Sequence, residues 1–357
     1  MTIEEIKSLA RHAANRTAPA EFSVSSVDQA LADQFKVMTQ SINDYQRNKY
    51  DIFDIIIENA DTIVPQKVMD QFSAFAEVRN VAQGDKVLFK RGPLGKARAK
   101  KFLTQVGLSG VYESFRLDSE TFTVSMKSIG GAVSIDFERM LDGVENLAEF
   151  MNVLAEAQVD GIYGEVQNAL LSATAHMPTA NYVSGSYSAA ALQALVNTVK
   201  RYGGGATIFA SPEFIDAMGP DAIVPAIAGA AQAIYPQDDI DSIHNTGRIK
   251  MFRGTPIVEL RQSWVDETNT QVMINPQYAY VLPTGGDKVV KIVMEGATQM
   301  WDYVNPDQSI EVNTYRKIGV GILAYNNWGV YQNTGISDAD WYNSGVLDIG
   351  VDLHVQP

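Results

Sequence analysis

The chain has 357 residues, a formal net charge of −14, 46% hydrophobic residues and 20% charged residues. This composition is that of a folded globular protein, and it excludes a disordered, collagen-like or coiled-coil chain. Cysteine is absent, which excludes disulfides, thiolate metal sites and a cysteine nucleophile. The negative charge argues against tight nonspecific binding of nucleic acid by the whole surface.

No membrane segment or signal peptide is expected. The most apolar run, 222–233, contains Pro225 and is shorter than the ~20 residues that a bilayer requires. The first five residues have no basic region followed by an apolar stretch. Synthesis in a cytoplasm is the simplest expectation.

The first 60 residues contain a helix-compatible stretch over 27–57. We expect a surface helix that packs on the body of the protein. An extended arm that docks on another subunit is the alternative.

A basic segment over 77–101 stands out from the acidic background. It holds eight basic residues against Glu77 and Asp85, so it carries +6 and the rest of the chain carries −20. Turn-forming residues (Gly84, Gly92, Pro93 and Gly95) lie within it. Its candidate contact residues are Lys86, Lys90, Arg91, Lys96, Arg98, Lys100 and Lys101.

Strand-like segments flank this basic segment. Residues 87–89 precede the turn, and residues 121–127 alternate apolar with polar side chains, which is typical of a half-buried strand. We therefore predict a long β-hairpin with a basic tip. A charge run is usually a solvated face, but the contrast with the acidic body favours a contact with a complementary surface.

The apolar spacing over 145–175 predicts one long helix of about 46 Å. Gly161 and Gly164 weaken it, so we expect it to lie along a sheet or a close backbone. A shorter helix is predicted over 134–141, before a break at Asp142-Gly143.

Helix and strand patterns mix over 186–282. We predict a helix over 188–200, a buried strand over 206–210 and a helix opened by Ser211-Pro212, with serine as the N-cap. A turn leads into a strand at 254–258, and another strand is predicted over 272–274.

Two strand patterns mark the C-terminal part. Ile310, Val312, Ile318, Val320 and Ile322 share one parity, and Glu311, Asn313 and Lys317 take the other. In the acidic tail a strand with one apolar face is predicted, and that face needs a cover from the same chain or a neighbour. Its apolar residues are Leu347, Ile349, Val351 and Leu353.

No motif argues for catalysis. Gly92-Pro93-Leu94-Gly95-Lys96 lacks the first glycine and the Ser/Thr of a phosphate loop. Gly319-Val320-Gly321 fits a dinucleotide pattern, but a strand-like segment follows it, which favours glycines in a close-packed strand. Residues 238–241 are acidic and favour a solvated loop. His176 and His244 have no partner in sequence. We therefore expect no catalytic residue, cofactor or metal site.

The order of these elements resembles the major capsid protein of tailed bacteriophages, with its Hong Kong 97-type fold. The stretches that carry the resemblance are 134–141 (SIDFERML), 146–175, 207–214 (TIFASPEF), 254–258 (GTPIV), 273–282 (MINPQYAYVL) and 289–332. It covers about 60–332. The resemblance implies an α+β fold with an N-terminal arm, an extended β-hairpin loop, a long spine helix, an axial domain and a peripheral domain.

The implied domains follow from the resemblance. They are an N-terminal arm (1–60), a peripheral domain with the spine helix (61–76 and 128–185), the extended loop (77–127), the axial domain (186–283), peripheral strands (284–332) and a tail strand (333–357).

The resemblance also implies a structural, non-enzymatic virion protein. It would assemble with itself into hexamers and pentamers of an icosahedral shell in the host bacterial cytoplasm, around double-stranded DNA bound without sequence specificity. Portal and scaffolding proteins, and a decoration protein, are the other implied partners. The alternatives are an encapsulin-like cargo shell and a soluble α/β enzyme with a carboxylate-lined cleft.

Overall fold

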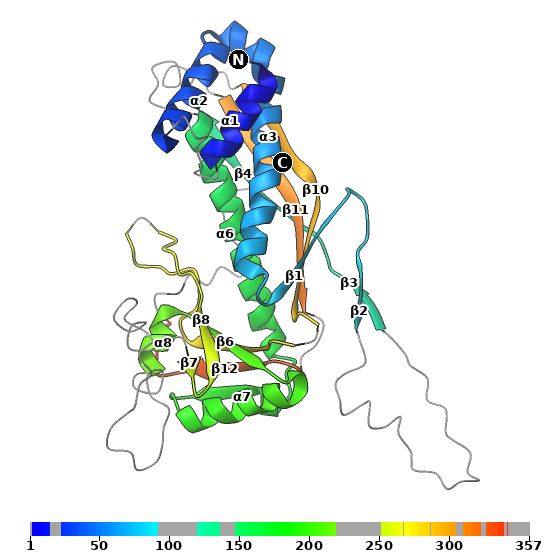
Figure 1. Cartoon of the computed structure of the whole chain (residues 1–357), viewed down its shortest axis with the longest axis vertical. Helices are drawn as coiled ribbons and strands as arrows, with labels where there is room; N and C mark the ends of the chain where they lie inside the picture. Colours follow the sequence, from blue (N-terminus) through cyan, green and yellow to red (C-terminus); the bar gives the residue numbers. More distant parts are fainter. Residues whose placement is uncertain are drawn as a thin grey trace, which may run out of the picture.

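The computed structural model describes residues 2–14, 23–91, 120–135, 147–218, 251–266, 268–285, 287–304, 310–322, 326–338 and 341. In these ranges the protein is an elongated body with helices at one end and a six-stranded sheet at the other. A two-stranded hairpin leaves its side (Figure 1). None of the described helices is long and apolar enough to cross a membrane.

Three helices build the N-terminal end: α1 (Ile3–Ala14), α2 (Val24–Met38) and α3 (Ile42–Phe72). The stretch predicted as one helix over 27–57 is thus two helices. Ser41 starts the second one, because its hydroxyl accepts a hydrogen bond from the N–H of Asp44 at 3.2 Å. The buried faces of the three helices pack together and onto Leu154 and Val312, so this segment packs on the body.

The long helix α6 (Leu147–Thr174) confirms the helix predicted over 145–175, across its described residues. Its 28 residues span about 42 Å. It packs against α3 and β11, with Ile162, Val166 and Leu170 buried in a shared apolar cluster. This contact with a helix and a sheet is the environment expected for a helix that contains glycines.

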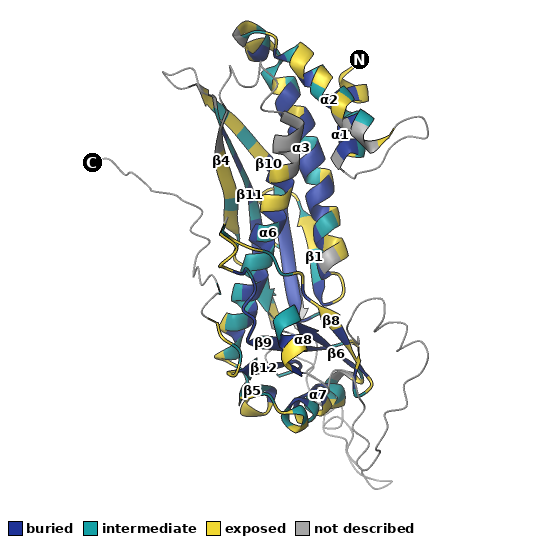
Figure 2. Ribbon diagram, turned by 90° about the vertical axis from the view of Figure 1, so that its left-hand side faces the viewer, coloured by how far each residue is buried: buried dark blue, intermediate teal, exposed yellow. Residues whose placement is uncertain are grey.

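The four-stranded sheet has the order β1-β10-β11-β4, from β1 (Ala76–Val81), β10 (Val290–Val304), β11 (Ile310–Ile322) and β4 (Lys127–Ile135). β1 runs parallel to β10, and the other pairs are antiparallel. Figure 2 shows buried residues along α3 and α6, whereas β4 and the far end of β10 are largely exposed.

Two local predictions are wrong here. Ser134 and Ile135, predicted to begin a short helix, belong to β4, because they pair with Glu311 and Ile310 of β11. The rest of that helix, 136–141, lies outside the described residues. The strand predicted over 121–127 is interrupted at 124–126, between β3 (Glu120–Thr123) and β4.

The six-stranded sheet has the order β5-β12-β9-β6-β8-β7. Its strands are β5 (Tyr182–Gly185), β12 (Gly329–Asn333), β9 (Tyr278–Pro283), β6 (Ala206–Ala210), β8 (Thr255–Glu259) and β7 (Met251–Phe252). The single-turn η2 (Thr179–Asn181) precedes β5, and α7 (Ala189–Gly203) and α8 (Pro212–Met218) pack with the sheet.

Most local predictions in this part are confirmed. The strand over 206–210 is β6, and Ser211 caps α8 by accepting a hydrogen bond from the N–H of Phe214 at 3.2 Å. The strand predicted over 272–274 is wrong, because only Val272 forms bridges, to Trp264 and Trp341. β12 pairs with β5 and β9 in this sheet. The division of the whole chain into domains stays a prediction.

Candidate functional site

The hairpin predicted around the basic segment has paired strands at its base. β2 (Leu88–Arg91) runs antiparallel to β3, with Leu88 opposite Thr123 and Arg91 opposite Glu120. Lys86 is described and exposed. Lys90 and Arg91 lie in β2, but their side chains are outside the described part, as are the whole residues Lys96, Arg98, Lys100 and Lys101. The contact role of these cations stays a prediction.

Phe89 anchors the hairpin to the body. Its side chain is 2% exposed, and its ring centroid lies 5.8 Å from that of Phe122 on β3. The guanidinium carbon of Arg79 lies 4.7 Å from the ring centroid of Phe89, and the Lys291 ammonium lies 5.6 Å from it. Burial of such a ring contributes roughly 1.5–3 kcal/mol, and a nearby cation adds about 0.5–2 kcal/mol.

A cluster of ion pairs lies beneath this ring. Lys291 of β10 is 1% exposed and is bonded to Glu77, its direct neighbour on β1, and to Asp287. Arg79 also donates to Glu77, from Nε at 2.7 Å. Burial would raise the pKa of Glu77, but the hydrogen bonds from Lys291 and Arg79 outweigh it and hold the pKa below its ordinary value. The buried ammonium is therefore paired, as a charge in this position must be.

Two glycines of β11 let the chain leaving the hairpin approach closely. A Cβ at Gly319 would lie 2.8 Å from the backbone oxygen of Ser125 and 2.9 Å from a methyl group of Val124. A Cβ at Gly321 would lie 3.0 Å from Val124. The prediction of glycines in a close-packed strand is thus confirmed, and the packed segment is the one that follows β3.

The turn that leads into the hairpin is also tied to the sheet. The N–H of Gly84, whose φ is +88°, donates to the Glu295 carboxylate at 2.8 Å. Glu295 lies at a register shift of β10 against β11, opposite Lys317, and its Oε1 is 3.7 Å from the Lys317 ammonium nitrogen. The hairpin is therefore held at its entry turn, at Phe89 and at its exit segment, which together fix its direction as it leaves the body.

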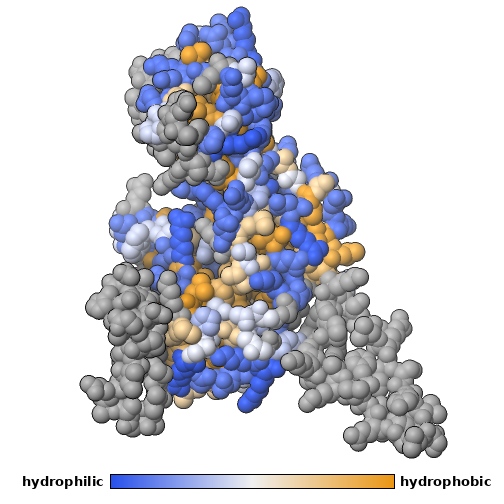
Figure 3. Space-filling model, viewed as in Figure 1, coloured by the Kyte–Doolittle hydropathy of each residue, from blue (hydrophilic) through white to orange (hydrophobic). Residues whose placement is uncertain are grey.

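The surface around this anchor is partly apolar. In Figure 3, hydrophobic residues gather in the middle of the face, beside α6, and near the hairpin, while the helical end is largely hydrophilic. Leu88 of β2 is 60% exposed. Leu88 is thus an exposed apolar side chain at the base of the hairpin, next to the buried ring of Phe89.

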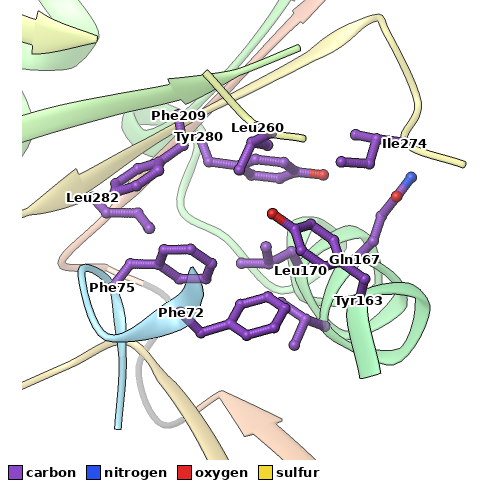
Figure 4. Close-up of a pocket in the computed structure, with 11 residues that line it drawn as sticks. Phe72, Phe75, Tyr163, Gln167, Leu170, Phe209, Leu260, Ile274, Tyr280 and Leu282 are labelled. Carbon is purple, nitrogen blue, oxygen red and sulfur yellow. The ribbon is translucent and has the colours of Figure 1, made fainter. Parts of the chain in front are cut away.

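A small apolar pocket lies where α6 and the end of α3 meet the six-stranded sheet (Figure 4). Its free space is about 20 Å³, room for a single water-sized molecule. The polar groups in its lining are the hydroxyls of Tyr163 and Tyr280 and the amide of Gln167. Burial raises the pKa of Tyr280, so its hydroxyl stays neutral. The pocket therefore holds no group for acid–base chemistry near neutral pH.

Most other residues singled out from the sequence fall outside the described structure. Residues 92–96, 238–241, His244 and the tail residues Leu347, Ile349, Val351 and Leu353 lie outside the described part of the chain. Among the described residues no group of three His, Asp or Glu side chains could hold a metal ion. Lys291 is the residue that sequence reasoning missed, although a lysine within the apolar run 289–294 was a signal.

Comparison with known protein families identifies one family that matches most of this chain. The sequence profile of the family described as "SPbeta prophage-derived putative capsid protein YonB" matches residues 6–332. No curated protein matches the chain.

Several solved structures are similar in fold. The bacteriophage PhiM1 mature capsid is 12% identical, covers 74% of this chain and 87% of its own, and has a TM-score of 0.49. The satellite phage P4 procapsid is 9% identical, covers 77% of this chain and 90% of its own, and has a TM-score of 0.49. The SrpI encapsulin complex from Synechococcus elongatus is 11% identical, covers 80% of this chain and 92% of its own, and has a TM-score of 0.45. These scores lie below 0.5, so the family assignment rests on the profile match.

Proposed function

This chain belongs to the family of the putative phage capsid protein YonB, which confirms the predicted relation to phage capsid proteins, and we propose that it is the major capsid protein of a tailed bacteriophage. It assembles with itself into hexamers and pentamers of an icosahedral shell around double-stranded DNA. The observation that carries the proposal is the profile match over 6–332. Its elements also follow the Hong Kong 97-type order of hairpin, long helix, sheet-bearing unit and returning long strands.

The hairpin anchor supports a role in assembly. A projection held at three places keeps its direction, so less conformational entropy is lost when its tip docks on a neighbour. The tip carries cations and the remainder of the chain carries −20. Charge complementarity of this kind fixes register and partner more than it adds affinity. Each exposed ion pair contributes roughly 0–1 kcal/mol, so stability comes from many contacts repeated around a ring.

The remaining assignments complete the proposal. The role is structural rather than catalytic, as membership of a capsid family supports. The location is the virion, after assembly in the host cytoplasm. Portal and scaffolding proteins are partners, with a decoration protein as a further one. DNA is enclosed without sequence-specific binding, and the acidic chain has little affinity for its phosphates, because phosphate binding needs a cationic face. The tail strand over 347–353 adds to a neighbour's sheet.

Electron microscopy of the purified full chain tests the function. Closed icosahedral particles are expected, and particles isolated from infected cells should contain DNA. Particles that contain a protein cargo in place of DNA would identify a cargo-enclosing shell of the encapsulin type. A monomer at every concentration and ionic strength would overturn both shells and favour the enzyme alternative.

A charge-reversal variant tests the role of the hairpin. Four tip cations are changed together to glutamate: Lys96, Arg98, Lys100 and Lys101. The variant should fold with unchanged circular dichroism but fail to form particles at moderate salt. A control variant reverses four exposed cations of the body: Lys36, Arg47, Arg201 and Arg261. Assembly of the first variant at the yield of the control would show that the tip is only a solvated loop.

A further inference from the structure

Two of the apolar clusters of the elongated body follow one another along α3 and α6. The cluster at the helical end contains Ile56, Leu154 and Val312, and the cluster nearer the six-stranded sheet contains Ile63, Ile162 and Ile318. Between them lie buried polar side chains, which we call the polar layer. Its members are Asn59, Gln158, Thr298, Thr314 and Arg316, each less than 5% exposed.

The polar layer crosses four elements at one level. On α3, Asn59 lies one turn from Ile56 and one from Ile63, and on α6 Gln158 is four residues from both Leu154 and Ile162. On β11, Thr314 and Arg316 share the inward parity of Val312 and Ile318. The elements are neighbours, since α3 packs on α6 and β10, and α6 packs on β11 (Figures 1 and 2).

Some atoms of the layer have partners. Asp61, half-buried at its rim, accepts hydrogen bonds from the backbone N–H and the hydroxyl of Thr298, at 2.9 and 2.8 Å. Nη1 of Arg316 lies 3.3 Å from the same carboxylate oxygen without forming a hydrogen bond to it. The amide nitrogen of Asn59 donates to the backbone oxygen of Ile55 at 2.8 Å.

Five buried atoms of the layer have no hydrogen-bond partner in the described structure. They are Oδ1 of Asn59, Oε1 and Nε2 of Gln158, and Nε and Nη1 of Arg316. Both polar atoms of the Gln158 side chain are therefore unpaired in the interior. Buried polar groups in folded proteins are nearly always hydrogen-bonded, so such a concentration at one level calls for a ligand.

The chemistry of these atoms selects the ligand. Two of them accept hydrogen bonds and three donate them. A cation would meet the Arg316 guanidinium, and an anion would meet the amide oxygens and the Asp61 carboxylate. Water both donates and accepts, and it fits a mixed set of donors and acceptors. We propose that the polar layer is a binding site for ordered water, held by Gln158 between Asn59 and Arg316.

Replacement of Gln158 by methionine distinguishes a wet layer from a dry one by the sign of its effect. In a wet layer Gln158→Met removes two partners of the water and leaves Arg316 and Asn59 unpaired, so the melting temperature of the full chain falls by roughly 2–5 °C. In a dry layer the same change removes two unpaired polar atoms, and the melting temperature rises. The matched control is Leu154→Met, one turn earlier on the same stripe of α6, which tests the packing of methionine without a change in polarity.

A fall for Gln158→Met that exceeds the fall for Leu154→Met supports the proposal, and a rise or an equal change overturns it. Should Gln158→Met fail to fold, a density map of the wild-type particle that resolves ordered solvent decides. Water density within hydrogen-bonding distance of the Gln158 amide supports the site. An amide in contact with carbon atoms alone overturns it.

Discussion

Replacement of Gly319 by alanine tests whether the hairpin is anchored by close packing. The new methyl group would lie 2.8 Å from both the backbone oxygen of Ser125 and the sulfur of Met126, and 2.9 Å from a methyl of Val124. The methionine sulfur can move aside. The Ser125 oxygen belongs to the backbone, so the segment that leaves the hairpin must shift.

The magnitude follows from two opposing effects. Overpacking of this kind costs about 1–3 kcal/mol, and the loss of glycine's freedom in the unfolded chain returns about 0.4–1 kcal/mol. The net effect is a destabilisation of about 1–2 kcal/mol. For a chain of 357 residues that corresponds to a fall in melting temperature of roughly 1–3 °C.

The assay is thermal unfolding of the unassembled chain, with limited proteolysis at the hairpin as a second readout. Gly131→Ala is the matched control, because Gly131 lies in β4 of the same sheet and no atom lies within 4 Å of its added Cβ. This control should be neutral or slightly stabilising, whereas Gly319→Ala should melt earlier and be cleaved faster. Equal melting temperatures and cleavage rates for the two variants would refute the anchoring role of Gly319.

Two further variants test the ion cluster and a helix cap. The lowered pKa of Glu77 means that its stabilising effect is present above about pH 4.5 and is lost as pH falls through the folded-state value, so Glu77→Gln should lower the melting temperature at pH 7 and flatten its fall in acid. Asp85→Asn, in the exposed turn nearby, removes an acidic side chain outside the ion cluster and is the matched control. Ser211→Ala removes the hydroxyl that caps α8 by accepting from the N–H of Phe214. It should lower the free energy of unfolding, measured with denaturant, by about 0.5–2 kcal/mol. Ser188→Ala should cost much less, since the Ser188 side chain forms no cap hydrogen bond; equal costs would contradict the capping argument.

The sequence predicted the elements whose signal is local. The helix over 145–175 was found because its apolar period extends over many residues, and the two short strands of the hairpin base were found because strand-like segments flank the basic turn. The glycines at 319 and 321 were also understood, since no helix pattern followed them. The α+β class was implied by the resemblance to tailed-phage capsid proteins, which rested on the order of the elements.

The sequence failed where pairing decided the structure. Ser134 and Ile135 look like a helix start, but their partners on β11 are about 175 residues away. The segment 272–274, predicted as a strand, has three apolar residues, but only Val272 pairs with other backbone segments, so no strand forms. Arg316 has the inward parity of β11, yet a charged side chain gave no reason to place it inside. Long-range contacts settle such residues, and one sequence does not reveal them.

The buried Lys291 of β10 can specify strand register, which the apolar side chains around it cannot. Apart from Lys291, residues 289–294 are apolar on both faces of the strand, and Val290 and Val293 are both buried although they point to opposite sides. The apolar pattern alone therefore does not set which face meets the helices. A slip by one residue would turn Lys291 toward α3 and α6 and away from Glu77, which would leave an unpaired charge in the core. We infer that the pair of Lys291 with Glu77 fixes the register of β1 on β10, and with it the place where Phe89 and the hairpin attach.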